Sequence, residues 1–244
     1  MNWYKPIEVK TELGELATWS FSGLKAFEEC PLRRYLEKVK GHRQESGPAA
    51  NRGTAYHDQI EQFIKGEIAD LPKMGDIPKA YIEKARETYP NGLITVEQNW
   101  YIDMDWNISD KDNFWGVFII DYFKRESETS AIITDWKTGK SRNNEMKHAE
   151  QLLLYAISAA ARFPELEYIH VGACYIDENC LKLERGYTKE QLEPMKQQFT
   201  KRAMNMTTCT NFIPQPNKFN CKYCALKSTI NEDTGQPVCE WGVL

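Results

Sequence analysis

Residues 115–140 read WGVFIIDYFKRESETSAIITDWKTGK and hold two short apolar runs on either side of a charged segment. The runs, Trp115–Phe123 and Ala131–Trp136, have the length of strands and are rich in β-branched and aromatic residues. Because only a short charged turn, KRESETS, separates them, we expect the two strands to pair antiparallel.

The segments on either side of this pair alternate between helical and strand periodicity. We expect helices beginning at Ser22 as a cap, from Pro31 to about Lys40, and over residues 54–65, 77–88, 145–162 and 188–206, the last with Thr188 and Gln191 as a capping box. We expect further strands over residues 93–102, 168–176 and up to Tyr187, and a polar loop over residues 41–53. This order predicts an α/β fold with a mixed central β-sheet flanked by helices.

Length and composition fit one soluble domain. The chain has 244 residues, of which 41% are hydrophobic and 27% charged. We expect a single domain over residues 1–244, with a helical part (22–90), a sheet core (91–187) and a C-terminal helix with a cysteine-rich tail (188–244). No run approaches the ~18 apolar residues of a membrane span. The first residues lack a basic start followed by an apolar run, so we expect no secretory signal and a cytoplasmic location.

The formal net charge of −4 gives no general support to nucleic-acid binding, but two segments are basic. Residues 31–43 hold five lysines and arginines against one glutamate, and residues 191–230 hold six against one. Such runs are often solvated surface. Because both lie close to cysteines, they are also candidates for a track that follows a DNA backbone.

The end of the second apolar run, Thr134-Asp135-Trp136-Lys137, combines an acid with a lysine two residues later. Residues i and i+2 of a strand point to the same face, so Asp135 and Lys137 are expected to face one site. Asp121 ends the apolar part of the first run. Two carboxylates from adjacent strands make a hard oxygen site suited to Mg²⁺ or Mn²⁺, and the lysine can stabilise charge during phosphodiester cleavage. The alternative is an ordinary Asp–Lys pair beside a turn.

These motifs together resemble the PD-(D/E)XK nuclease superfamily in its RecB-like branch. The resemblance rests on short segments that stand in the family's order between about Ser22 and Cys239: SGLKAFEECPLRRYL (22–36), RGTAYH (52–57), Gly116–Asp121, Asp135–Lys137 and QLLLY (151–155). It implies a restriction-endonuclease-like core that binds Mg²⁺ or Mn²⁺ and acts on DNA.

The resemblance also implies the site residues: the metal ligands His57, Asp121 and Asp135, and the catalytic residues Asp121, Asp135, Lys137, Gln151 and Tyr155. From the residues alone, His57 can equally be a half-buried structural histidine. Gln151 and Tyr155 share a helix face and can be ordinary packing. Glu61, one turn after His57, and Glu97 are further candidate acids.

The seven cysteines are unevenly spaced, which argues against a disulfide framework and for metal binding or burial. Cys221 and Cys224 form a tight C-x2-C pair, fourteen residues lie between Cys224 and Cys239, and Cys30 directly precedes a proline. Four thiolates of this kind can bind one [4Fe–4S] cluster or one Zn²⁺.

The layout is similar to that of the iron–sulfur-containing members of the family, which include AddB and the CRISPR-associated RecB-like exonucleases. The resemblance implies a [4Fe–4S] cluster that staples the N- and C-terminal segments through Cys30, Cys221, Cys224 and Cys239. The last gap is longer than the family's, so zinc and no metal stay alternatives. Cys174 and Cys180 are expected to be buried or strand residues, and Cys209 is a spare candidate ligand.

The sequence therefore predicts a metal-dependent DNA nuclease, an exonuclease that acts on single-stranded ends in recombination, repair or DNA processing. The alternative is a non-catalytic nucleic-acid-binding module with a structural zinc or iron–sulfur site. A third reading, a zinc-stapled structural protein, leaves the acids unexplained. Lys137 favours the nuclease, because a binding module has no use for a lysine two residues after an acid.

Overall fold

The computed structural model describes residues 13–42, 47–222, 224–231 and 234–242. The chain forms two compact units, one of residues 45–199 and the other of residues 1–44 with residues 200–244. Helix α6 (Lys189–Thr207) spans the division between them. Among the described residues, no helix combines the length and the apolar character that crossing a membrane requires. The single-domain organisation expected from the sequence stays a prediction.

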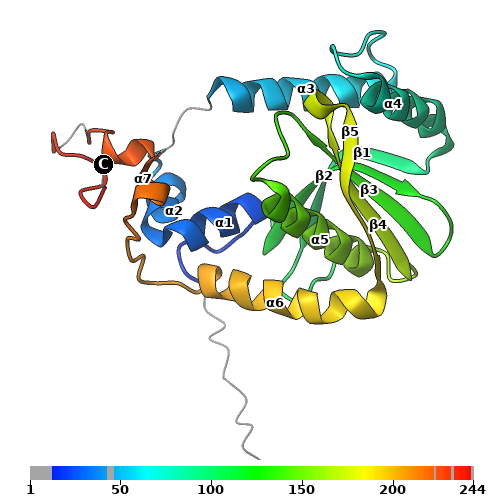
Figure 1. The fold of residues 1–244 in the computed structure, drawn as a ribbon. Helices are drawn as coiled ribbons and strands as arrows, with labels where there is room; N and C mark the ends of the chain where they lie inside the picture. Colours follow the sequence, from blue (N-terminus) through cyan, green and yellow to red (C-terminus); the bar gives the residue numbers. More distant parts are fainter. Residues whose placement is uncertain (1–12, 43–46, 223, 232–233, 243–244) are drawn as a thin grey trace, which may run out of the picture. The chain divides into compact units, whose positions relative to one another are not determined.

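The larger unit is built on a five-stranded mixed sheet in the order β1-β2-β3-β4-β5 (Figure 1). Its strands are β1 (Ile94–Ile102), β2 (Gly116–Arg125), β3 (Ser130–Lys137), β4 (Tyr168–Tyr175) and β5 (Cys180–Thr188). Neighbouring strands pair antiparallel except β3 and β4. These two are parallel because helix α5 (Glu145–Arg162) carries the chain back to the edge of the sheet at which β3 begins. The α/β fold and the antiparallel β2–β3 pair expected from the sequence are confirmed.

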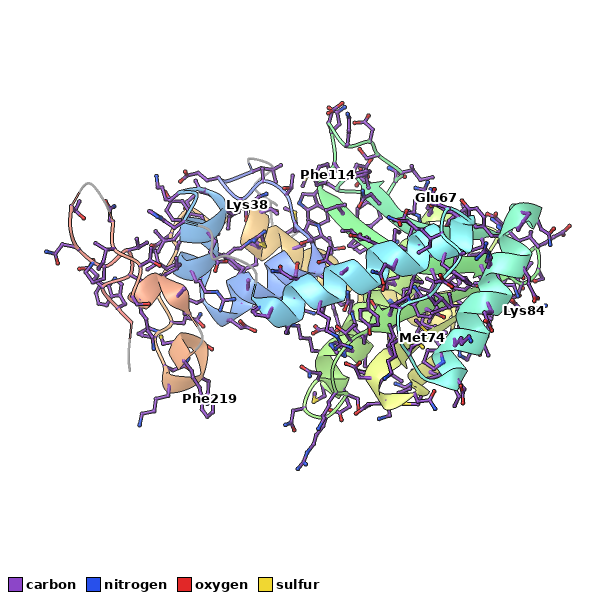
Figure 2. The ribbon with its side chains drawn as sticks, turned by 90° about the horizontal axis from the view of Figure 1, so that it is seen from above. Lys38, Glu67, Met74, Lys84, Phe114 and Phe219 are labelled. Atoms are coloured by element: carbon purple, nitrogen blue, oxygen red, sulfur yellow. The ribbon has the colours of Figure 1, made fainter. Side chains whose placement is uncertain are left out.

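Helices flank this sheet (Figure 1). Helix α3 (Pro48–Lys65) lies across the strands and is followed by α4 (Asp76–Thr88) and the short η1 (Tyr89–Asn91) (Figure 2). Their apolar side chains share one core with residues of the strands and of the turn that follows β4: Ile60, Phe63, Ile64, Ile82 and Ala85 pack with Ile94, Val96, Tyr122, Trp136, Cys174 and Ile176. Helix α5 buries a run of its own, from Leu152 to Ala159 except for Leu153. The sheet is therefore held rigidly, and its strand ends can position a site.

Two local predictions are wrong. The polar stretch expected as a loop is helical from Pro48 onward, because proline suits the first turn of a helix and Gly47 provides an extended N-cap. Residues 43–46 of that predicted loop lie outside the described residues. Helix α1 (Phe21–Glu29) is capped by Ser20, whose Oγ accepts the Gly23 N–H at 3.2 Å, and not by Ser22.

The β2–β3 ladder stops before the strands do, and the site lies at this opening. The register pairs end at Tyr122↔Thr134. Beyond them, the backbone N–H of Trp136 donates to the side chain of Asp121, 2.8 Å from Oδ2. The β1–β2 register omits Glu97, which has a φ of +47°, together with Asp121 opposite it. Two acids thus occupy irregular positions of the β1–β2 and β2–β3 pairs.

The smaller unit contains α1, α2 (Pro31–Lys38), the last part of α6, α7 (Lys218–Lys222) and the turn η3 (Ala225–Lys227). The Arg202 guanidinium donates to both carboxylate oxygens of Glu28, at 2.6 and 2.9 Å. Tyr35 stacks on Phe212 with ring centroids 4.4 Å apart. These contacts join the first helices to the segment that follows residue 200.

Candidate active site

Side chains from α3, β1 and β2 converge on one point of the larger unit. Ligand atoms of His57, Glu97 and Asp121 all lie within 4.8 Å of one another. His57 Nδ1 is 2.9 Å from Glu97 Oε1 and 3.6 Å from Asp121 Oδ2. Across the described ranges, no other three His, Cys, Asp or Glu side chains meet in this way. One imidazole with two carboxylates is a donor set for a divalent cation such as Mn²⁺ or Mg²⁺.

The backbone fixes which nitrogen of His57 faces the acids. His57 Nε2 lies 3.0 Å from the carbonyl oxygen of Trp136, which can only accept, so Nε2 carries a proton. Nδ1 then turns toward Glu97 and Asp121. Burial lowers the pKa of His57, but the hydrogen bond with Glu97 and the charges of Asp121, Glu97 and Asp135 outweigh it and raise the pKa to about 9. Without a metal, a proton on Nδ1 therefore supplies the positive charge that these acids require.

Asp121 is the most deeply buried member of the group. Its side chain is only 6% exposed, and Oδ2 accepts the Trp136 N–H. Burial, followed by the negative charge of Asp135, raises the pKa of Asp121 well above its usual value, although His57 and Lys137 act in the other direction. A buried carboxylate crowded by a second one favours the binding of a cation.

Three side chains hold Lys137 in place, two by direct contact and the third through one of these two. Its Nζ lies 2.6 Å from Asp135 Oδ2 and donates to Gln151 Oε1 at 3.0 Å. Gln151 Nε2 in turn donates to Tyr155 Oη at 2.6 Å. Burial lowers the pKa of Lys137, but the charges of Asp135 and Asp121 outweigh it and raise the pKa, so the ammonium stays charged. The result is a fixed positive charge next to a cation site.

The structure brings together every predicted site residue of the larger unit: His57, Asp121, Asp135, Lys137, Gln151 and Tyr155. It adds Glu97, which the sequence offers only as a minor candidate. Glu97 is on the strand next to that of Asp121, and this position was the sequence signal that could have identified it as a site residue. Glu61 pairs instead with Lys65 Nζ at 2.6 Å.

Two further interactions beside the site carry no sequence signal. His148, one turn before Gln151, has its Nδ1 2.6 Å from the hydroxyl oxygen of Tyr175. In the turn η2 (Ile176–Glu178), Asp177 accepts from the Arg52 guanidinium and, at 2.6 Å, from the backbone N–H of Gly139. Gly139 has a φ of +87°, which a glycine adopts without strain. The chain is therefore pinned just after Lys137.

The two basic segments predicted as a DNA track are partly neutralised by acids. Arg33 lies near Glu29 and Glu37, at 3.2 and 3.6 Å. In the other segment, Lys196 pairs with Glu193 at 2.9 Å, and Arg202 is held by a glutamate. Their role as a track stays a prediction.

The four predicted cysteine ligands line one cavity of the smaller unit. Cys30, Cys221, Cys224 and Cys239 surround it together with Arg33, and Cys209 does not reach it. All seven cysteines are free thiols. Within the described residues no three cysteine sulfurs lie within 4.8 Å of one another, so the structure shows a shared cavity and no closed cluster. Cys174 is buried, as expected.

Comparison with known proteins agrees with the motifs. Residues 18–112 and 113–229 match the family model of the PD-(D/E)XK nuclease superfamily. No curated protein matches the chain. The crystal structure of SSO0001 is similar, with a TM-score of 0.50 and 16% identity over 96% of this chain and 91% of that chain. A protein from Eubacterium rectale described as "Putative exonuclease" has a TM-score of 0.42 and 11% identity over 83% of this chain and 91% of that chain. At these identities the likeness to SSO0001 concerns the fold alone.

Proposed function

Because the chain belongs to the PD-(D/E)XK nuclease superfamily, we propose that it is a metal-dependent nuclease that hydrolyses DNA phosphodiester bonds as an exonuclease on single-stranded ends. The observation that carries this proposal is the convergence of His57, Glu97 and Asp121 beside the fixed ammonium of Lys137. A structural ion pair needs none of these additional groups. In a metal-dependent nuclease, the cation activates the reaction and a fixed positive charge next to it stabilises the negative charge that develops in the transition state.

The residues present fit Mn²⁺ or Mg²⁺. His57 offers Nδ1 to the cation while Nε2 donates to the Trp136 carbonyl, the orientation that backbone acceptors impose on metal-binding histidines. Glu97 and Asp121 offer carboxylate oxygens, and we include Asp135 as a further ligand. Because one ligand is an imidazole, we expect Mn²⁺ to bind more tightly than Mg²⁺.

A bound divalent cation supplies a Lewis acid that polarises a phosphoryl oxygen and acidifies a water molecule. The chain's own residues do the positioning. Lys137 holds its charge where negative charge develops in the transition state. Asp135 and Gln151 orient the ammonium, and Tyr155 orients Gln151. Gln151 and Tyr155 are therefore positioning residues.

We also propose a [4Fe–4S] cluster in the smaller unit, bound by Cys30, Cys221, Cys224 and Cys239. The four thiols line one cavity, which supports a common ligand. Zinc–sulfur bonds of about 2.3 Å bring the sulfurs of one zinc site to within about 4.6 Å of one another. No three cysteine sulfurs among the described residues lie that close, so the proposed cluster rests on the shared cavity and zinc stays the alternative.

The nuclease is tested with single-stranded DNA labelled at the 5′ or the 3′ end, in Mg²⁺, Mn²⁺ or a chelator. Stepwise shortening that needs a cation supports an exonuclease, and the label gives its polarity. Asp121→Asn should abolish cleavage, whereas Asp58→Asn, an exposed acid on α3 next to His57, should not. DNA binding without cleavage in either cation would contradict the proposal and support the non-catalytic module.

A further inference from the structure

Three exposed cations, Lys140, Arg142 and Lys147, follow Lys137 within ten residues. None of them forms an ion pair with any residue that the structure describes. Residues 138–148 contain one acid, Glu145, so the segment has a formal charge of +3 − 1 = +2.

Cations elsewhere on the larger unit are mostly neutralised. The lysines of α4 pair with glutamates one turn away, Lys79 with Glu83 at 3.8 Å and Lys84 with Glu87 at 2.9 Å. Figure 2 shows Lys84 on the outer side of α4. Helix surfaces with alternating charges of this kind are ordinary solvated faces. Lys140, Arg142 and Lys147 differ in that three unpaired cations stand within one short segment, whereas other unpaired cations such as Lys73 and Lys111 are far apart in the chain.

The backbone that carries the three cations is anchored. The Gly139 N–H donates to Asp177 at 2.6 Å. Ser141 is buried, and its hydroxyl accepts from Lys182 Nζ at 2.9 Å. The side-chain amide of Asn144 donates to the carbonyl of Lys140 at 3.2 Å. With its backbone fixed at these points, the segment loses less entropy when its side chains bind a ligand.

The acids near the segment are already neutralised. Asp177 is held by two hydrogen bonds from the Arg52 guanidinium, and Glu178 lies 2.6 Å from Lys182 Nζ. These acids therefore do not cancel the charge of Lys140 and Arg142.

The segment also adjoins the candidate active site. Lys147 stands one turn before Gln151, so both lie on the same side of α5. Burial and the charge of Lys137, with a smaller effect of Lys147, lower the pKa of His148 to about 4. Lys137 and Lys147 therefore both contribute positive charge to the surroundings of His148.

We propose that Lys140, Arg142 and Lys147 form a binding surface for the phosphates of the DNA strand that enters the site. This inference rests on the proposed function. A nucleic acid is favoured over an acidic protein because the segment directly follows Lys137 in the chain and Lys147 shares a face of α5 with Gln151, next to the proposed nuclease site. A phosphate chain also offers several anions in succession, which a short series of unpaired cations can bind.

The test compares two variants that lose the same charge. One is Lys140→Ala/Arg142→Ala/Lys147→Ala. The matched control is Lys73→Ala/Lys111→Ala/Arg185→Ala, which removes three exposed cations of the same unit that also lack an ion pair among the described residues. Binding of fluorescent single-stranded DNA is measured in chelator at several salt concentrations, with a thermal melt of each protein.

Each phosphate contact with a single strand contributes about 0.7 to the slope of log K against log salt. Loss of three contacts should lower the slope by about 2 and the affinity in 0.1 M salt by roughly a hundredfold. The control should keep the parent's slope, affinity and cleavage. The variant that only exchanges lysine and arginine, Lys140→Arg/Arg142→Lys/Lys147→Arg, should keep the slope as well, which separates charge from misfolding.

The possible failures differ. A parent protein that neither binds nor cuts DNA overturns the proposed function and this inference together. A parent that cuts DNA while the two alanine variants show equal slopes overturns only the inference, and the segment then recognises another partner.

Discussion

Lys137→Ala tests the proposed chemistry most directly, because the structure predicts opposite effects on catalysis and on metal binding. The substitution removes an ammonium that lies 2.6 Å from Asp135 Oδ2 and 3.0 Å from Gln151 Oε1. Catalysis should suffer, because the positive charge next to the reacting phosphate is lost. Metal binding should not become weaker, because the ammonium no longer competes with the cation for Asp135.

The size of the rate loss follows from the charge removed. A unit charge about 4 Å from an ammonium gains about 4 kcal/mol at an effective dielectric constant of about 20. Only the part gained between the ground state and the transition state affects the rate. We therefore expect a loss of about 3 kcal/mol, or roughly a hundredfold in rate. The side chain of Lys137 is only 17% exposed, so water cannot replace the lost charge efficiently.

The assay is single-turnover cleavage of end-labelled single-stranded DNA at saturating Mn²⁺, together with calorimetric titration of Mn²⁺. Lys73→Ala, the same substitution at an exposed lysine, is the control. Cleavage within a few-fold of the parent would refute the role of Lys137. A variant that loses metal affinity in proportion to its rate would show instead that Lys137 only maintains the shape of the site.

Three other predictions concern His57, Tyr155 and the cysteines. In the metal-free protein, folding raises the pKa of His57 from 6.5 to about 9, so the contribution of His57 to stability is complete below pH 6.5 and is lost as the pH rises through 9. Thermal melts should show this decrease in stability for the parent and not for His57→Gln. Equal pH profiles of the two proteins would contradict the prediction. Tyr155→Phe removes the acceptor of Gln151 Nε2 and should lower the free energy of unfolding by about 1–3 kcal/mol in urea, whereas no change would mean that the bond is unimportant. Protein purified without oxygen should be brown with about four irons per chain, and Cys30→Ser should lose both; a colourless parent with one zinc would replace the cluster.

The strand pattern explains why much of the site was predictable. Asp135 and Lys137 are two residues apart on one strand, and this spacing alone places them on one face. Asp121 follows an apolar run of strand length, and a short turn joins the two strands. Both relations are local in the sequence. Gln151 and Tyr155 are one helical turn apart, and only the resemblance to the family identified them as site residues.

Glu97 shows where such reasoning ends. Strand alternation cannot predict where its side chain points, because its backbone has a φ of +47° and the β1–β2 register omits it. A non-glycine residue in this conformation is unfavourable unless the surrounding structure holds it. The start of α3 at Pro48 was missed for a different reason: the polar stretch was interpreted as a loop, although a proline suits the first turn of a helix.

The formal charges of the site agree with the proposed binding of a cation. Three carboxylates, Glu97, Asp121 and Asp135, face two cationic side chains, Lys137 and protonated His57, which leaves one negative charge in excess. This excess, in a buried place, agrees with the raised pKa of Asp121. A divalent cation that displaces the proton from His57 makes the sum zero. A proton on Asp121 also balances this charge, so the proposed divalent cation competes with protons for the site, while the same carboxylates keep Lys137 protonated.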